Sequence, residues 1–154
     1  MSKATSFNVY QASAGSGKTF TLIKEYLKLC LQSESTIDNY RHILAITFTN
    51  AAANEMKDKI VNNLCEIVGI KEAKKDGMKK ALLKDLGISE EGLKRNAQSL
   101  LTRIIHDYSS FCVCTIDSFV QKLSRSFAHD LGLPNQYTVS IDVEEVAESI
   151  TEQI

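Results

Sequence analysis

Apolar side chains recur every three or four residues in four stretches of the chain, a spacing that predicts amphipathic helices. The predicted inward faces are Phe20, Ile23, Leu27 and Leu31; Met56, Ile60, Leu64 and Ile67; Leu93, Ala97, Leu100, Leu101, Ile104 and Ile105; and Val120, Leu123 and Phe127. A shorter helix is expected at about 71–85, and the last of these helices is expected at 117–131. Ser89, which precedes two glutamates, is predicted to cap the third helix.

Extended segments alternate with these helices. Residues 6–10 read as a strand, and the continuous apolar run at 43–48 is typical of a strand buried on both faces. Further extended segments are predicted at 111–115 and 137–141. Because helices separate them, the strands are expected to pair in parallel through right-handed crossovers. The predicted fold class is therefore α/β, a single domain over 1–154 in which helices flank a parallel sheet, with an extra helical insertion at about 71–110.

Composition and charge bear on which classes of partner the chain can have. The chain of 154 residues has a net charge of −1 with 44% hydrophobic and 24% charged residues, as in ordinary globular proteins. A strongly basic protein can be expected to bind nucleic acid from its overall charge alone, and this chain is not basic. Any contact with nucleic acid must therefore be made by local groups. No signal peptide pattern precedes Tyr10, and no run approaches the roughly 18 apolar residues that span a membrane. We therefore expect a cytoplasmic protein without a membrane partner.

The four cysteines are expected to be reduced thiols. Cys30 and Cys65 fall inside helical apolar patterns, and Cys112 and Cys114 alternate along a predicted strand. A structural zinc site usually needs two cysteine pairs, and only one C-x-C occurs.

A glycine-rich loop between the first predicted strand and the first helix carries the strongest chemical signal. The segment Ala12-Ser-Ala-Gly-Ser-Gly-Lys18-Thr19 follows the phosphate-loop pattern G-x-x-x-x-G-K-[ST] except at its first position. Gly15 and Gly17 allow backbone amides to point inward toward an anion, at the positive end of the following helix. Lys18 is predicted to reach the β- and γ-phosphates, and the Thr19 hydroxyl to ligate Mg²⁺. The predicted nucleotide-binding residues are Ala12, Ser13, Ala14, Gly15, Ser16, Gly17, Lys18, Thr19 and Phe20.

One alternative for this loop is a flexible Gly-Ser-Gly turn before a helix cap. That alternative leaves the lysine and threonine at the required positions to coincidence. The sequence thus favours binding of a nucleoside triphosphate with magnesium.

Three motifs together resemble one helicase family. The segment Thr47-Phe-Thr-Asn50-Ala-Ala-Ala-Asn-Glu-Met-Lys57 resembles motif Ia of superfamily 1 helicases of the UvrD/Rep/RecB group, and Thr115-Ile-Asp-Ser-Phe119 resembles their T-x-H-S-F motif. The loop, continued through Leu22, is similar to the RecB/AddA form, in which alanine commonly replaces the first glycine. The resemblance covers about residues 7–142 in family order. It implies a RecA-like P-loop NTPase fold, truncated here, with ATP and Mg²⁺ as cofactors and Lys18 and Thr19 as catalytic residues.

The resemblance also implies a groove for single-stranded DNA. Thr49 and Asn50 offer a hydroxyl and an amide to a phosphate, and Phe119 offers a ring on which a base could stack. The alternatives are an ordinary helix cap at Thr49–Asn50 and core packing for Phe119. Asp117 stands where most members have histidine. The implied DNA-binding residues are Thr49, Asn50, Thr115, Asp117, Ser118 and Phe119.

Hydrolysis of ATP in this family needs a Walker B pair of acids at the end of an apolar strand. After Asp142 the acidic residues follow a helical pattern instead, and residues 142–154 are expected to begin a helical insert. The sequence therefore predicts an N-terminal piece of the first motor domain that binds ATP and does not hydrolyse it alone. The resemblance implies a longer 3′-to-5′ single-stranded DNA translocase or helicase of DNA repair, whose partners are DNA, its remaining helicase domains and a nuclease subunit.

Two other functions remain open at this point. A small P-loop nucleotide kinase or phosphotransferase would need acceptor and lid arginines, whereas Arg95, Arg103 and Arg125 are scattered. A non-catalytic module that binds DNA or a protein partner would not need the nucleotide.

Overall fold

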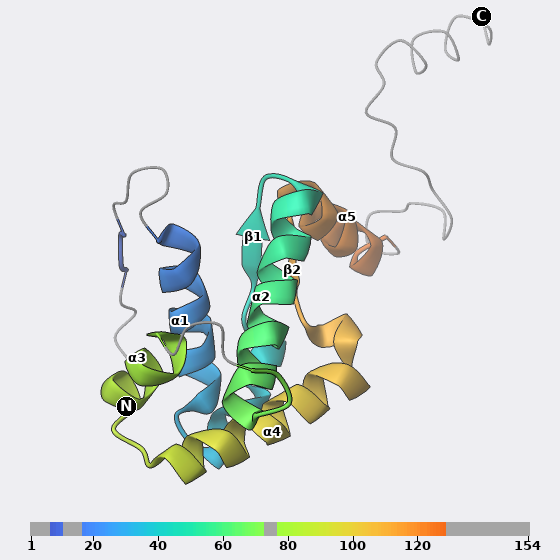
Figure 1. Ribbon diagram of the computed structural model, residues 1–154. Helices are drawn as coiled ribbons and strands as arrows, with labels where there is room; N and C mark the ends of the chain where they lie inside the picture. Colours follow the sequence, from blue (N-terminus) through green and yellow to red (C-terminus); the bar gives the residue numbers. More distant parts are fainter. Residues whose placement is uncertain (1–6, 11–16, 73–76, 129–154) are drawn as a thin grey trace, which may run out of the picture. The chain divides into compact units, whose positions relative to one another are not determined.

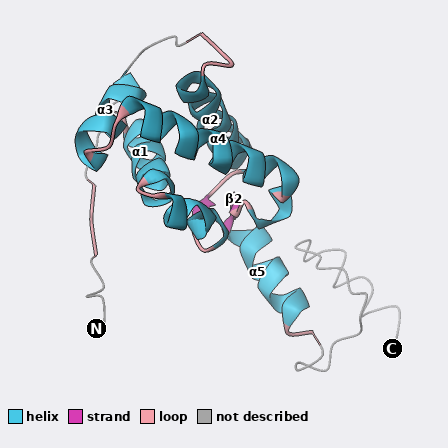
Figure 2. Cartoon of the chain, turned by 90° about the horizontal axis from the view of Figure 1, so that it is seen from below, coloured by secondary structure: helices cyan, strands magenta, loops and turns pink. Residues whose placement is uncertain are grey.

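The computed structural model describes residues 7–10, 17–72 and 77–128 (Figure 1). Its contacts group residues 1–114 and 115–154 into two compact units, which are described one at a time. The described part of the chain is mostly helical, with a small amount of strand (Figure 2). Its elements are α1 (Lys18–Leu31), the 3₁₀ helix η1 (Glu34–Arg41), β1 (Ala45–Thr47), α2 (Asn50–Val68), α3 (Gly77–Leu86), α4 (Glu90–His106), the 3₁₀ helix η2 (Tyr108–Ser110), β2 (Val113–Thr115) and α5 (Ile116–Ser126).

The core of the first unit lies among α1, η1, α2, α3 and α4, which pack against one another. The predicted inward faces of α1, α2 and α4 are confirmed as buried, with two exceptions. Phe20 is 43% exposed in the first turn of α1, and Ile105 is 65% exposed in the last turn of α4. Helical spacing places these two side chains near the apolar stripe, but they lie at helix ends that the described residues leave partly uncovered.

Within the described residues, two of the expected extended segments pair as strands. β1 and β2 form a two-stranded parallel sheet, in which the Ala45 N–H donates to the carbonyl oxygen of Cys112 at 3.0 Å. Residues 7–10, expected to belong to a strand, have no regular secondary structure, and that part of the prediction is wrong. The expected burial of the 43–48 run on both faces is also wrong, because Leu44, Ile46 and Phe48 alternate on an exposed face. The segments predicted at 137–141 and 142–154 lie outside the described residues.

Two side-chain amides from other elements satisfy carbonyls in the last turn of α1. The amide of Asn39 donates to the carbonyl oxygen of Leu29 at 2.9 Å, and the buried amide of Asn96 donates to that of Leu31 at 3.0 Å. The Thr36 hydroxyl donates to the carbonyl oxygen of Ser33 at 2.8 Å and lies 3.2 Å from that of Cys30. Helix ends leave such carbonyls without partners inside the helix. These bonds therefore attach the end of α1 to η1 and α4.

Within the described residues of the 71–110 segment, the two expected helices are confirmed as α3 and α4. Ser89 caps α4 as predicted, since its hydroxyl oxygen accepts the Gly92 N–H at 3.1 Å. Lys24 of α1 pairs with Asp85 of α3 at 2.7 Å. α3 is thereby joined to the helix that follows the glycine loop.

The second unit contributes α5 to the described residues. The predicted helix at 117–131 is shorter in the structure and ends at Ser126. Val120, Leu123 and Phe127, expected to face inward, are 53%, 47% and 50% exposed, so that expectation is wrong. The spacing correctly indicated an amphipathic helix, but within the described residues nothing buries its apolar face.

All four cysteines lie in the described part of the chain, and each is a thiol. Cys30 is buried, and burial raises the pKa of its thiol to about 12. None of the helices in the described ranges has both the length and the apolar character that a membrane span requires.

Candidate functional site

Gly17 turns the chain into α1 with a left-handed backbone conformation. Its φ and ψ are 84° and 17°, and its carbonyl oxygen accepts the Thr21 N–H at 2.9 Å. A residue with a Cβ is strained at this φ, so a glycine belongs here. No side chain caps the start of α1 within the described residues. The first N–H groups of the helix and the positive end of its dipole lie at this turn, and both suit an anion.

Lys18 and Thr19 form the first turn of α1, and both are exposed. Their ammonium and hydroxyl groups therefore lie beside the open N-terminus of the helix. The preceding loop residues of the predicted site, Ala12, Ser13, Ala14, Gly15 and Ser16, lie outside the described residues.

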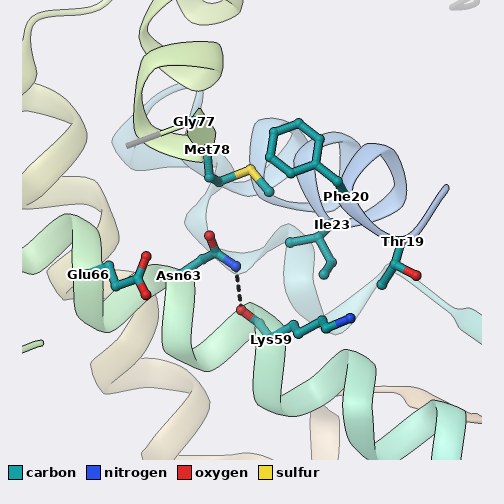
Figure 3. Close-up of a pocket in the computed structure, with 8 residues that line it drawn as sticks. All are labelled: Thr19, Phe20, Ile23, Lys59, Asn63, Glu66, Gly77 and Met78. Carbon is teal, nitrogen blue, oxygen red and sulfur yellow. Dashed lines mark hydrogen bonds between the residues drawn. The ribbon is translucent and has the colours of Figure 1, made fainter. Parts of the chain in front are cut away.

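A cavity of about 490 Å³ opens beside this first turn (Figure 3). Three helices of the first unit surround it, and each contributes side chains from a short stretch. The lining residues are Thr19, Phe20 and Ile23 of α1; Lys59, Asn63 and Glu66 of α2; and Gly77 and Met78 of α3. Sequence reasoning found Thr19 and Phe20 but missed the residues of α2 and α3. The sequence signal that could have indicated the residues of α2 is their spacing. Lys59, Asn63 and Glu66 are four and three residues apart and so share one face of the helix, beside its apolar stripe.

Thr49 caps α2 two residues after the end of strand β1. Its hydroxyl oxygen accepts the Ala52 N–H at 3.1 Å, and its backbone carbonyl accepts the hydroxyl of Thr47 at the same distance. Thr49 and Asn50 are both exposed. The helix-cap interpretation of Thr49 is thus confirmed. The hydroxyl still has its own hydrogen to donate outward, so a cap does not prevent a phosphate contact.

Thr115, the last residue of strand β2, repeats this arrangement as the cap of α5. Its hydroxyl oxygen accepts the Ser118 N–H at 3.2 Å and lies 2.9 Å from the Ser118 hydroxyl, and its side chain is buried. Asp117 is exposed, while Ser118 and Phe119 are half-buried. The half-buried ring of Phe119 is compatible with partial packing and with a face open to a ligand.

The candidate metal ligand in the described part of the site is the Thr19 hydroxyl. Across residues 7–10, 17–72 and 77–128, no three His, Cys, Asp or Glu side chains cluster to hold a metal ion. Mg²⁺ commonly takes one or two protein oxygens and completes its shell with water and substrate phosphates. The exposed Thr19 hydroxyl fits that pattern at the open end of α1.

The comparisons with known proteins agree on one family. The model of the UvrD/REP helicase N-terminal domain matches residues 2–154. An ATP-dependent helicase/nuclease subunit from Clostridium perfringens is 36% identical over 102 residues, which cover 66% of this chain and 7% of that protein. Its counterpart of the same name from Bacillus cytotoxicus is 32% identical over 133 residues, or 86% of this chain and 9% of that protein.

A third relative is the RecB protein of the RecBCD enzyme of Chlamydia pneumoniae, 46% identical over 56 residues, or 36% of this chain and 5% of that protein. The chain spans less than a tenth of the length of each of these three relatives. No solved structure matches it significantly. Because the family model matches nearly every residue, the chain belongs to the UvrD/REP helicase N-terminal domain family.

Proposed function

We propose that this chain is the ATP-binding N-terminal portion of an ATP-dependent single-stranded DNA translocase of the AddA/RecB kind. The observation that carries the proposal is the placement of Lys18 and Thr19 in the first turn of α1, directly after the left-handed Gly17. A triphosphate at this helix end would meet free backbone N–H groups and the Lys18 ammonium. Mg²⁺ held by the Thr19 hydroxyl would neutralise charge that develops on the phosphates.

The DNA contacts are proposed at the two threonine caps. Thr49 and Asn50 at the start of α2 present a hydroxyl and an amide, and Asp117, Ser118 and Phe119 follow the cap at Thr115. Hydroxyls, amides and backbone N–H groups bind phosphates without reading base edges. We therefore expect DNA binding with little sequence preference. The relation to helicase/nuclease proteins supports the proposal that the whole protein works with a nuclease in DNA repair.

A thermal-shift experiment tests the nucleotide site. MgATP at a hundred times its dissociation constant should add about 2.7 kcal/mol of stability. For a chain of this size that corresponds to roughly 5–10 °C. Lys18→Ala should lose most of the shift while its apo melting temperature stays close to that of the unchanged chain. Lys28→Ala, on the same helix and paired with Glu25, is the matched control and should keep the shift. An equal shift in both variants would mean that the nucleotide binds elsewhere.

The 154-residue chain alone is expected to bind ATP without turnover. Phosphoryl transfer depends on positioned magnesium, water and arginine, and the sequence offers no strand-end acid pair to hold the metal and activate the water. The check is release of phosphate with and without single-stranded DNA. A turnover near one per second that disappears in Lys18→Ala would instead support a small phosphotransferase.

A further inference from the structure

Another cavity lies at the end of α1 that is remote from Gly17, where the chain enters η1 and meets the start of α4. Figure 1 shows α4 passing below this end of α1. The volume of the cavity is about 390 Å³, within the range of roughly 300–1,000 Å³ that small-molecule pockets occupy. Its lining residues all belong to the described part of the first unit: Gln32, Ser33 and Glu34 from the junction of α1 and η1, and Ile88, Ser89, Gly92, Arg95 and Asn96 from the start of α4 and the residues before it.

Asn96 brings a buried hydrogen-bond acceptor to this cavity. Its side chain is 6% exposed, and its amide nitrogen donates to the carbonyl oxygen of Leu31 at 3.0 Å. That bond fixes the orientation of the amide, so the side-chain oxygen points away from Leu31. Among the described residues no group donates to this oxygen, and the enclosed side-chain polar atom without a partner is the Tyr26 hydroxyl instead. Because buried acceptors normally have a donor, the Asn96 oxygen is available to a donor from a ligand in the cavity.

Two charged side chains of opposite sign line the cavity. Glu34 is the first residue of η1, and Arg95 lies in the second turn of α4. Within the described ranges they do not pair with each other, and neither pairs with another residue. A guanidinium matches the geometry of a carboxylate, and a glutamate accepts hydrogen bonds from an ammonium group. A matching ligand therefore carries one charge of each sign.

The neutral lining groups suit a small ligand with an aliphatic part. The Ser89 hydroxyl oxygen accepts the Gly92 N–H at 3.1 Å, which leaves the hydroxyl hydrogen for a ligand. Ile88 is half-buried and packs against the core, and its remaining surface is apolar. The cavity thus offers donors, acceptors and an apolar contact within one small volume.

We propose that this cavity binds a free α-amino acid. In this assignment the α-carboxylate accepts hydrogen bonds from the Arg95 guanidinium and the Ser89 hydroxyl. The α-ammonium group donates to the Asn96 oxygen and the Glu34 carboxylate, and an aliphatic side chain lies against Ile88. The ligand thereby connects η1 to α4. The inference is independent of the proposed function, because the cavity contains no residue of the proposed nucleotide site.

Isothermal titration calorimetry with three probes tests which charges the cavity requires. L-leucine carries both charges. Leucinamide lacks the carboxylate and resembles the first residue of a peptide, whereas N-acetylleucine lacks the ammonium group and resembles the last residue. Because a hydrogen bond to a charged group is worth about a factor of ten in affinity, each derivative should bind at least about tenfold more weakly than L-leucine. These comparisons use the unchanged chain and do not depend on the folding of a variant.

Neutral variants of charged residues localise the binding. Arg95→Gln and Glu34→Gln each remove one charge from the cavity and should each weaken the binding of L-leucine about tenfold. Lys94→Gln and Glu91→Gln are the matched controls, because these residues of α4 are not among the lining residues, and both should bind L-leucine as the unchanged chain does. All four residues are exposed, so the melting temperatures of the variants without ligand should stay close to that of the unchanged chain.

Each alternative to the assignment has its own result. Equal affinity for L-leucine and leucinamide would indicate a site for the amino terminus of a peptide, and equal affinity for L-leucine and N-acetylleucine would indicate a simple anion site. Either result would overturn the proposal, as would the absence of binding by all three probes at millimolar concentration. If Arg95→Gln binds L-leucine as tightly as Lys94→Gln does, the amino acid binds elsewhere. None of these results bears on the nucleotide site, which the Lys18→Ala variant tests separately.

Discussion

Thr49 is expected to perform two tasks that substitution can separate. Its hydroxyl oxygen caps α2 by accepting the Ala52 N–H at 3.1 Å, and its hydroxyl hydrogen is available to a DNA phosphate. Thr49→Ala should remove both interactions. Loss of a threonine cap costs about 1 kcal/mol. For a chain of this size the melting temperature should fall by about 2–4 °C.

Thr49→Asp should separate the tasks. Aspartate is a strong helix cap, and its charge is favourable at the positive end of the 19-residue helix α2, so the melting temperature should stay within about a degree of the parent. A carboxylate cannot donate to a phosphate and repels it, so the affinity for DNA should fall further than in Thr49→Ala. Thr49→Ser, which keeps the hydroxyl, should preserve both properties.

The assay is fluorescence anisotropy of a labelled oligothymidine across a salt series, with melting curves on the same samples. Each lost phosphate contact should make the log–log salt dependence shallower by about 0.7. Ser89→Asp is the matched control, because Ser89 caps α4 in the same way and the change adds the same charge away from the DNA motifs. If Thr49→Asp binds DNA as tightly as the parent at every salt concentration, the contact at motif Ia does not exist.

Three further predictions concern stability. Asn96→Leu removes the buried amide that donates to the last carbonyl of α1, and urea denaturation should show a loss of about 1–3 kcal/mol. Gly17→Ala should lower the free energy of unfolding by about 1–2 kcal/mol because of the positive φ at Gly17. Gly77→Ala, in open space without a positive φ, should leave the stability unchanged. Equal melting temperatures of the two variants would contradict this reasoning. The Lys24 ammonium lowers the pKa of the Asp85 carboxyl, so their pairing stabilises the fold above the ordinary pKa of about 3.9 and is lost as the pH falls through the lower folded value. Asp85→Asn should therefore flatten the drop in melting temperature below about pH 4, and an unchanged acid profile would refute the link.

Local sequence patterns were sufficient for the features that neighbouring residues determine. The caps at Ser89 and Thr49 follow from a hydroxyl three residues before a helical N–H, and the buried stripes of α1, α2 and α4 follow from helical spacing. The membership in the helicase family was likewise evident from three short motifs. Gly17, which the sequence predicted to let the backbone turn before the first helix, has a left-handed conformation.

The tertiary structure decided the features that depend on distant residues. The apolar run at 43–48 predicted a buried strand, yet Ile46 is 45% exposed, because burial requires a second layer and periodicity does not specify one. Likewise, helical spacing indicated the apolar face of α5 but did not determine whether another element buries it. The cavity is lined by Phe20, Asn63 and Met78, among other residues. Phe20 and Asn63 are more than 40 residues apart in the sequence, and the three side chains come together only when three helices pack. A pattern confined to one helix can mark which face is polar, but it cannot identify the neighbours that enclose a cavity beside this face.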